Sequence, residues 1–285
     1  MDSARPSHSA SDFISPNDLW TLIGTAQAPQ IVDTRKRAVY DSAPGLLPGA
    51  VWRDIADIER WSGELDRDRP VVFACRFAHY MSQIPAAHLR GEGFDARVLA
   101  GGYAGWIESK LPLVGKPALD RFMPQRPSLW VTRRHPKIDR VACPWLIRRF
   151  LDPRARILYV DPDQVVDAAK ETGAIQFDIE GVEISHDGPR CSFDTMLKLF
   201  GLEDEPSLNR LALIVRGADT ARPDLAPEAA GLHAVSLGLS ALAGDDDHGL
   251  LRHGFMVYDA LFAYLRFAAQ ERHNWPAKVA RTVAA

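Results

Sequence analysis

The sequence has no long hydrophobic run and only three cysteines. No apolar stretch approaches the roughly 20 residues that a membrane-spanning helix needs, so no membrane contact is expected. Residues 1–11 lack the basic-then-apolar pattern of a secretory signal and are interpreted as a disordered lead-in. The cysteines at 75, 143 and 191 are sparse and odd in number, which favours reduced thiols over a disulfide framework. These features predict a cytoplasmic protein.

A strong net charge is also missing. The 34 Lys and Arg residues nearly balance the 37 Asp and Glu residues, for a net charge of −3. With no basic stripe and no obvious helix-turn-helix, nucleic-acid binding is not expected. Hydrophobic residues make up 46% of the 285 residues, which is ordinary for a soluble protein of one or two domains. Internal repeats and low-complexity tracts are absent. The sequence does not indicate an oligomeric state.

Residues 12–115 have the pattern of an α/β domain with a parallel sheet. Apolar segments at 31–33, 50–52, 70–75 and 96–99 predict strands, and the segment at 70–75 is a continuous β-branched and aromatic run. A helix is predicted to begin at Ser15 and Pro16, and another to span 82–91. Strands that alternate with helices indicate parallel pairing with helices on the faces of the sheet.

Residues 116–127 are rich in proline and are interpreted as an interdomain linker. Residues 128–275 are predicted to form a second, helix-rich mixed α/β domain. The predicted strands of this domain are 129–132, 157–160, 175–178 and 182–184. The predicted helices are 139–150, 162–172, 193–200, 207–218, 227–242 and 248–270. Pro144 must lie in the first turn of its helix or kink it.

Cys75 ends the clearest strand and precedes a predicted helix, which places its thiol in a strand–loop–helix turn. Backbone amides and a helix N-terminus at such a turn stabilise an anion, whether a thiolate, a persulfide or an oxyanion. The loop residues predicted to bind an oxyanion are Arg76, Phe77, Ala78, His79 and Tyr80. Taken alone, Cys75 also fits a buried cysteine at a strand end.

The flanking motifs resemble the rhodanese family. The first comprises Asp33, Arg35, Tyr40 and residues 47–50, and the second comprises residues 98–106 and 111–113. The resemblance implies that Cys75 carries sulfur as a persulfide, taken from a small-molecule donor such as thiosulfate and passed to a thiol acceptor. It implies that residues 76–81 form the amide cradle.

The resemblance also assigns roles to the charged residues of this half. Arg76 and His79 add positive charge near the thiol, and Asp33 and Arg35 are the family's paired residues beneath the site. We therefore count Cys75 and these four residues as candidate catalytic residues. Two positions depart from the family pattern, since Ala78 replaces a usual glycine and Tyr80 replaces an arginine or small hydroxyl residue.

The second half resembles the C-terminal domain of ChrB-type chromate-resistance proteins. The similarity rests on residues 130–134, 138–150, 177–178, 181–183, 186, 191–193 and 216–220. It implies an acceptor, a metal or an oxyanion such as chromate as the ligand of this domain. Five arginines are concentrated enough to suggest an oxyanion pocket, or equally a solvated face paired to acids: Arg133, Arg134, Arg140, Arg148 and Arg149.

A metal site is the one cofactor that the second half suggests. Glu183, His186 and Cys191 lie within nine positions, and Cys143 or Asp178 could complete a zinc or iron site. The alternative is a strand, a turn and a helix start with a hydrogen-bonded histidine and a half-buried cysteine. The acids at 245–247 are interpreted as favourable charges at a helix N-terminus rather than as ligands.

Three hypotheses follow for the whole chain. The first is a sulfurtransferase that uses Cys75 and is joined to a chromate-resistance domain. The second is a non-catalytic metal or chromate sensor or regulator that has repurposed its rhodanese-like domain. The third is that the second domain is itself a metal-dependent enzyme. Metal content and transfer of sulfur from thiosulfate would separate them.

Overall fold

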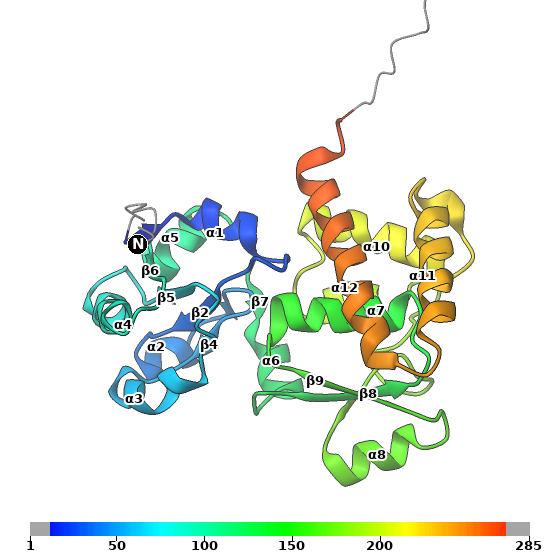
Figure 1. Cartoon of the computed structure of the whole chain (residues 1–285), viewed down its shortest axis with the longest axis horizontal. Coiled ribbons are helices and arrows are strands. Elements are labelled where there is room, and N and C mark those ends of the chain that lie inside the picture. The colour runs from blue at the N-terminus through cyan, green and yellow to red at the C-terminus, as the bar shows by residue number, and fades with distance from the viewer. Residues whose placement is uncertain (1–11, 272–285) are drawn as a thin grey trace, which may run out of the picture.

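A computed structural model describes residues 12–271 of the chain. The two halves lie side by side, with the N-terminal half in blue to cyan and the C-terminal half in green to orange (Figure 1). Within the described residues, no helix has both the length and the apolar character that crossing a bilayer would require.

A five-stranded parallel sheet forms the centre of the N-terminal half, as predicted. Its order is β1 (Phe13–Ile14), β6 (Ala96–Leu99), β5 (Val71–Ala74), β2 (Gln30–Asp33) and β4 (Val51–Trp52). The helices of this half are α1 (Pro16–Leu22), α2 (Arg37–Asp41), α3 (Ile58–Trp61), α4 (Tyr80–Gly91) and α5 (Gly102–Glu108). All four residues of β5 are buried, which agrees with their uninterrupted apolar sequence. The carboxyl end of this strand carries Cys75.

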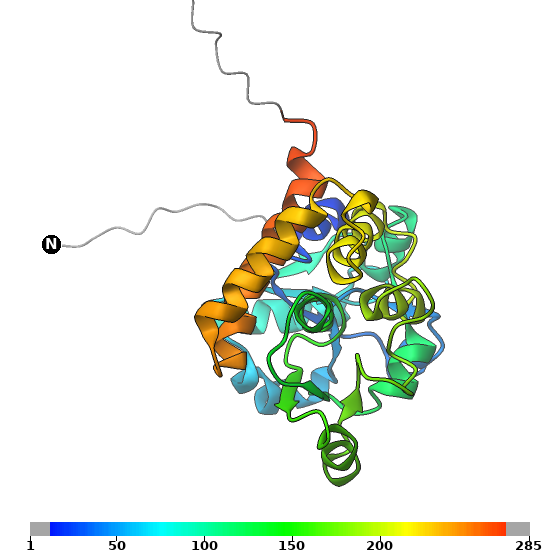
Figure 2. The same cartoon turned by 90° about the vertical axis from the view of Figure 1, so that its right-hand side faces the viewer.

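The C-terminal half has a smaller parallel sheet and more helix. The sheet runs in the order β10 (Ile175–Gln176), β8 (Leu129–Arg133) and β9 (Arg156–Val160). The helices are α7 (Asp139–Leu146), α8 (Val165–Thr172), α9 (Ser192–Leu199), α10 (Pro206–Asp219), α11 (Ala229–Ala243) and α12 (Asp247–Ala263). In the rotated view, α11 and α12 run beside one another across the molecule, and α8 projects away from the other helices (Figure 2).

One predicted helix of this half differs in detail and one predicted strand was wrong. The α-helix that begins at Asp139 ends at Leu146, and residues Ile147–Leu151 continue as a π-helix. Pro144 lies inside the helix and has no N–H to donate, so the regular hydrogen-bond ladder is interrupted there. The predicted strand at 182–184 is a series of bends that pairs with no strand among residues 12–271, and it follows Gly181, whose φ is +83°.

The proline-rich segment at 116–127 has structure of its own. It contains α6 (Lys116–Phe122), which follows β7 (Val114–Gly115), and β7 pairs antiparallel with β3 (Gly45–Leu46). Leu119 and Met123 are buried in the hydrophobic core. The segment predicted as a linker therefore packs as part of the protein rather than as a free connection.

One hydrophobic core runs through both halves. The same cluster contains Leu19 and Trp106 from the first half, and Trp145, Phe150 and Phe262 from the second. The rings of Trp20 and Phe150 pack at a centroid distance of 6.3 Å. The N–H of Gly49 donates to the carbonyl of Phe150 at 2.6 Å. The halves are thus joined by packing as well as by the chain.

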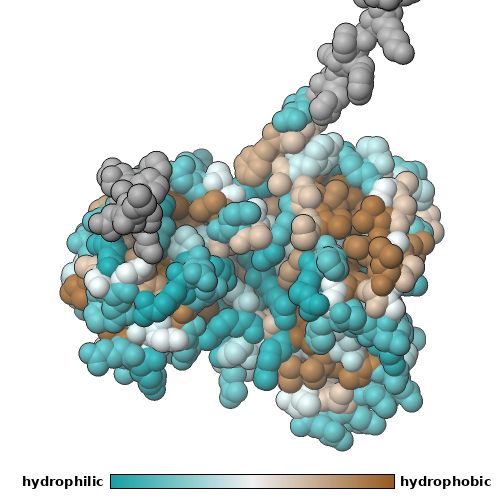
Figure 3. All heavy atoms as spheres, viewed as in Figure 1, coloured by the Kyte–Doolittle hydropathy of each residue, from teal (hydrophilic) through white to brown (hydrophobic). Residues whose placement is uncertain are grey.

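Apolar side chains also reach the surface of the C-terminal half. They gather on the face in Figure 3 over the region of α11 and α12. Val235, Leu237 and Leu242 are exposed on α11, whereas Ala229 and Leu232 of the same helix are buried. α11 therefore presents apolar residues to solvent as well as to the core.

Candidate functional site

Cys75 lies in the loop between β5 and α4, at the place that its sequence context predicted. The residue is 3% exposed. Its Sγ accepts a hydrogen bond from Ser82 Oγ at 3.2 Å, and the thiol lies 3.8 Å from the His79 carbonyl, to which it donates. Ser82 is in the first turn of α4, so the helix fixes the partner of the thiol.

The loop after Cys75 offers free backbone donors. Within residues 12–271, no protein group accepts a hydrogen bond from the backbone N–H groups of residues 76–81. Ala78 has a φ of +59°, a left-handed conformation that glycine would adopt more easily. Free N–H groups in a turn that leads to a helix N-terminus are the groups that bind anions in proteins.

The carbonyl side of the same loop is held by α5. The N–H groups of Tyr103 and Ala104 donate to the carbonyls of Cys75 and Arg76, at 2.8 and 3.0 Å. A Cβ atom added to Gly102 would lie 2.3 Å from the Cys75 carbonyl oxygen, so only glycine fits there. These two bonds and the close approach at Gly102 fix the backbone of the loop against α5.

Asp33 and Arg35 pair with each other, not with the thiol. Arg35 Nη2 lies 2.6 Å from Asp33 Oδ2, and both side chains are buried. The Arg35 guanidinium stacks 3.7 Å from the centroid of the Tyr103 ring, and Tyr103 in turn binds the Cys75 carbonyl. This places Asp33 and Arg35 among the residues that position the loop.

The other predicted loop residues lie at the surface. Arg76, Phe77, His79 and Tyr80 are exposed, and Tyr80 is 55% exposed. The Arg76 guanidinium stacks on Phe77, and the Phe77 and His79 rings lie 5.8 Å apart. Ala78 is buried, so the predicted oxyanion-binding residues form a rim of four exposed side chains around one buried methyl group.

The C-terminal half gathers a second group of polar side chains around His186. The His186 Nε2 atom lies 3.3 Å from Asp219, 3.5 Å from Asp178 and 3.7 Å from Asp139. Asp139 begins α7, Asp219 ends α10, and Asp178 and His186 lie in the segment between β10 and α9. Asp139, His186 and Asp219 offer ligand atoms that all lie within 4.8 Å of one another.

The charges of this group are only partly compensated. Asp178 forms ion pairs with Arg133 and Arg140, at 3.2 and 3.3 Å. Within the described part of the chain, no lysine or arginine lies within ion-pair distance of Asp139 or Asp219. Burial raises the pKa of Asp139 well above its usual range, and the neighbouring carboxylates of Asp178 and Asp219 raise it further.

The backbone around this group is strained. Ile138, which immediately precedes Asp139, has a φ of +24°, and Asp178 has a φ of +53°. Left-handed conformations are costly for these residues, above all for a β-branched side chain, and such strain is common at functional sites. The two Asp139 oxygens accept from the N–H groups of Ser192 and Phe193, at 2.6 and 2.9 Å.

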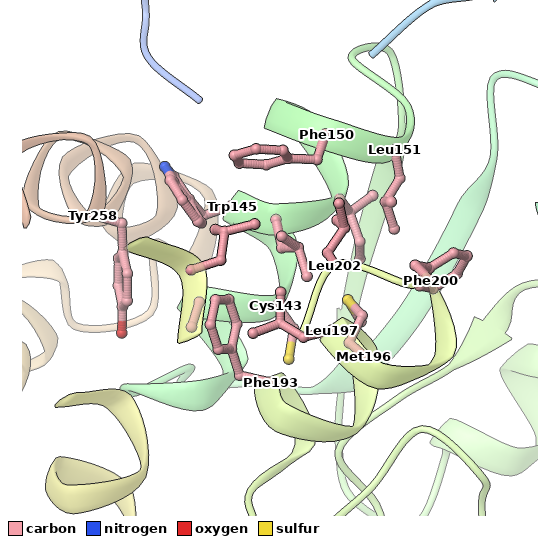
Figure 4. Packing of buried hydrophobic residues seen from close by; sticks show 14 of the residues in the cluster. Cys143, Trp145, Phe150, Leu151, Phe193, Met196, Leu197, Phe200, Leu202 and Tyr258 are labelled. Carbon is pink, nitrogen blue, oxygen red and sulfur yellow. The ribbon is translucent and has the colours of Figure 1, made fainter. Parts of the chain in front are cut away.

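The structure does not bring the four predicted metal ligands together. The Glu183 carboxylate pairs with the exposed Arg121. Cys143 is completely buried and packs with Phe193, Met196 and Leu197 (Figure 4). Its thiol donates to Asp139 Oδ1 at 3.7 Å, so it borders the group around His186. Cys191 is completely buried too, and burial raises the pKa of both thiols well above their usual range, so they stay protonated. Of the four, only His186 lies in the group just described.

The five clustered arginines do not form one pocket. Arg133 and Arg140 pair with Asp178, Arg134 with Asp161 and Asp245, and Arg149 with Asp259. Arg148 and Arg149 line a cavity of about 220 Å³ between the two halves, together with Arg69. The arginine-rich sequence thus serves several separate contacts.

Sequence reasoning missed Asp139 and Asp219 as partners of His186. Their separation along the chain is large, and helices α7 and α10 bring them together only in the fold. The available signal was that both acids lie in the segments that resemble the ChrB-type domain, beside Asp178 and His186.

Comparisons with known proteins match the two halves of the chain to two different families. Residues 15–109 match a family model described as a rhodanese-like domain, and residues 130–265 match the model of the ChrB C-terminal domain. Protein ChrB of Cupriavidus metallidurans is 39% identical over 136 residues, which are 47% of this chain. The match spans only 40% of that relative's length.

Solved structures are similar to the N-terminal half. A rhodanese-like domain protein from Staphylococcus aureus is 22% identical. The match covers 33% of this chain and 89% of that protein's chain, with a TM-score of 0.30. A rhodanese homologue from Thermus thermophilus is 27% identical. The match covers 32% of this chain and 95% of the homologue's chain, with a TM-score of 0.26. The expected α/β fold class is confirmed. The chain joins a rhodanese-like domain at residues 15–109 to a ChrB C-terminal domain at residues 130–265.

Proposed function

We propose that the N-terminal half is a sulfurtransferase that carries sulfur as a persulfide on Cys75. The observation that carries the proposal is the set of unbonded N–H groups at residues 76–81, which follow the thiol directly. These groups would surround a terminal sulfur or a departing oxyanion and neutralise its charge without reorganisation. Ser82, which donates to Sγ, would stabilise the thiolate.

The proposed reaction has two displacements. The Cys75 thiolate attacks the outer sulfur of thiosulfate, the sulfur–sulfur bond of thiosulfate breaks, and sulfite leaves with the bonding pair. A thiolate or cyanide acceptor then attacks the terminal sulfur of the persulfide, and the Cys75 thiolate is released. Arg76 and His79, exposed at the rim, would attract the anionic donor.

Mass spectrometry after incubation with thiosulfate tests this proposal. The peptide that contains Cys75 should gain the mass of one sulfur atom, and added cyanide should remove it as thiocyanate. Cys75→Ser should abolish both signals. The peptides with the buried Cys143 and Cys191 serve as internal controls and should not change. Sulfur on those peptides, or thiocyanate formation that survives in Cys75→Ser, would contradict the assignment.

A sensor without turnover is the second candidate. The near-complete burial of Cys75 favours it, because burial restricts approach to the thiol. The same experiment separates the two functions. A Cys75 peptide that stays unmodified by thiosulfate, in a protein that binds a ligand through its second half, would support the sensor.

For the ChrB C-terminal domain we propose that the cavity between the halves binds a tetrahedral oxyanion such as chromate. Arg69 and Arg148 both line it, and within residues 12–271 neither has a carboxylate at ion-pair distance. Burial lowers the pKa of both guanidinium groups, as expected for positive charges without a counter-ion. A tetrahedral dianion would supply that counter-ion.

Equilibrium dialysis with sulfate or molybdate, which do not oxidise thiols as chromate does, tests the oxyanion site. Arg148→Gln should weaken binding by at least about tenfold, since a charged hydrogen bond contributes roughly 1.5–3 kcal/mol. Arg134→Gln is the matched control, because that arginine pairs with exposed carboxylates. Equal loss in the two variants would count against the cavity.

A further inference from the structure

The group around His186 has the spacing of a metal site. We infer that Asp139, His186 and Asp219 bind a divalent first-row transition metal ion. Metal–ligand bonds of about 2.0–2.2 Å place two ligands of a tetrahedral ion roughly 3.3–3.6 Å apart. Nε2 of His186 lies 3.3 Å from the nearest oxygen of Asp219 and 3.7 Å from that of Asp139.

The charge of the group fits the same ion. Asp178 is neutralised by Arg133 and Arg140, whereas Asp139 and Asp219 have no lysine or arginine at ion-pair distance among the described residues and face only His186. The Asp139 side chain is 2% exposed, and burying a carboxylate without a lysine or arginine beside it is costly. A divalent cation between the two would balance both charges.

The orientation of the Asp139 carboxylate and the solvent access to the group also agree with a bound metal ion. Two backbone N–H groups at the start of α9 hold the Asp139 oxygens, and the Cys143 thiol donates weakly to Oδ1, which leaves a lone pair of Oδ2 free for a metal. Exposure rises across the group, from Asp139 through Asp219 at 19% to His186 at 44%. The open side lets an ion enter and leaves a coordination position for water or a substrate. This donor set of oxygen and nitrogen suits Mn²⁺, Fe²⁺ or Zn²⁺.

The inference is independent of sulfur transfer, because none of these residues lies in the rhodanese-like domain. The test uses the full-length protein after treatment with a chelator. Co²⁺, added as a spectroscopic probe, should bind stoichiometrically and give visible d–d bands. His186→Ala should weaken Co²⁺ and Zn²⁺ binding by at least about 100-fold, because even residues behind the ligands typically contribute 10–100-fold.

Variants and controls make the test decisive. Asp219→Asn is nearly isosteric and should weaken binding similarly. His88→Ala is the matched control, since His88 faces Glu92 at 3.3 Å in a comparable exposed pair. Glu183→Gln should also leave affinity unchanged. Unchanged affinity in both His186→Ala and Asp219→Asn, or no Co²⁺ binding by the parent protein, would overturn the site. A near-ultraviolet thiolate-to-cobalt band would place the ion at one of the three cysteines and would also overturn the site.

Discussion

A single hydrogen atom in place of a side chain decides the shape of the Cys75 loop. Gly102 has a φ of +59°, and its α-carbon faces the carbonyl of Cys75. A methyl group there would meet three backbone atoms of the loop at less than 3.0 Å. Backbone atoms cannot rotate away as a side-chain end can, so the loop itself would have to move.

Gly102→Ala should therefore destabilise the protein by about 3 kcal/mol or more, from left-handed strain plus overpacking. Persulfide formation should fall with it, because the N–H groups of the loop would shift. Gly93→Ala provides the comparison, since Gly93 also has a positive φ but nothing within 4 Å of the added methyl. It should cost only about 1–2 kcal/mol. Urea unfolding gives both values, and equal values would show that the close approach does not matter.

Ion pairs and caps set the limits of the helices. Asp246 was interpreted from the sequence as one of three acids at a helix start, and it is the N-cap of α12. Its carboxylate accepts from the N–H of Gly249 at 2.7 Å. Asp245, one position earlier, instead pairs with Arg134.

Asp246→Ala should lower the free energy of unfolding by about 1 kcal/mol, the usual contribution of an N-cap side chain. Asp246→Asn should retain most of it, because an amide oxygen also caps. Thermal or urea unfolding measures the difference. Loss of equal size in Asp246→Ala and Asp246→Asn would assign the effect to charge instead of to capping.

Elements with a strong local signal could be predicted, and those set by tertiary contacts could not. The strand Ala96–Leu99 and the start of α1 at Pro16 match the prediction because their signals lie within the element. The residues at 182–184 are apolar and acidic in alternation, but Glu183 pairs with the exposed Arg121, and no strand of the described chain pairs with them. Their conformation depends on tertiary contacts, which the alternation of apolar and polar residues in the sequence does not predict.

The same contrast holds for the two sites. Cys75 and its loop are contiguous in sequence, so strand, thiol and helix start could be recognised together. The partners Asp139 and Asp219 of His186 come from two other segments, α7 and α10, whereas Cys191 is closer in sequence but is completely buried. Proximity in sequence suggested the cysteines as metal ligands beside His186, whereas the fold places carboxylates next to it.

At the scale of the whole molecule, charged side chains join the two domains. The carboxylate of Glu64 accepts from Arg154 of the second half at 2.8 Å and also pairs with Arg53. The hydrogen bond from Arg154 lowers the pKa of Glu64 below its ordinary value of 4.5, and Arg53 contributes to the shift. Arg266, in the last described turn, donates to the Trp20 carbonyl at 2.8 Å.

The pH dependence of stability should show the Glu64 contact. Because the folded pKa is lowered, the contribution is present above pH 4.5 and is lost as the pH falls through the folded value. Glu64 is 44% exposed, so Glu64→Gln should cost no more than about 1 kcal/mol at neutral pH. Glu59→Gln, an exposed neighbour, should have little effect. A Glu64→Gln deficit that persists or grows in acid would contradict this assignment.

The core that crosses from one domain to the other affects how variants are interpreted. Damage to the packing of Trp145 or Phe150 would loosen the scaffold under Cys75, although neither residue belongs to the rhodanese-like domain. Reduced turnover after a change in the distant half would therefore be no proof of chemical participation. Such a variant is informative only if its melting behaviour matches that of the parent protein.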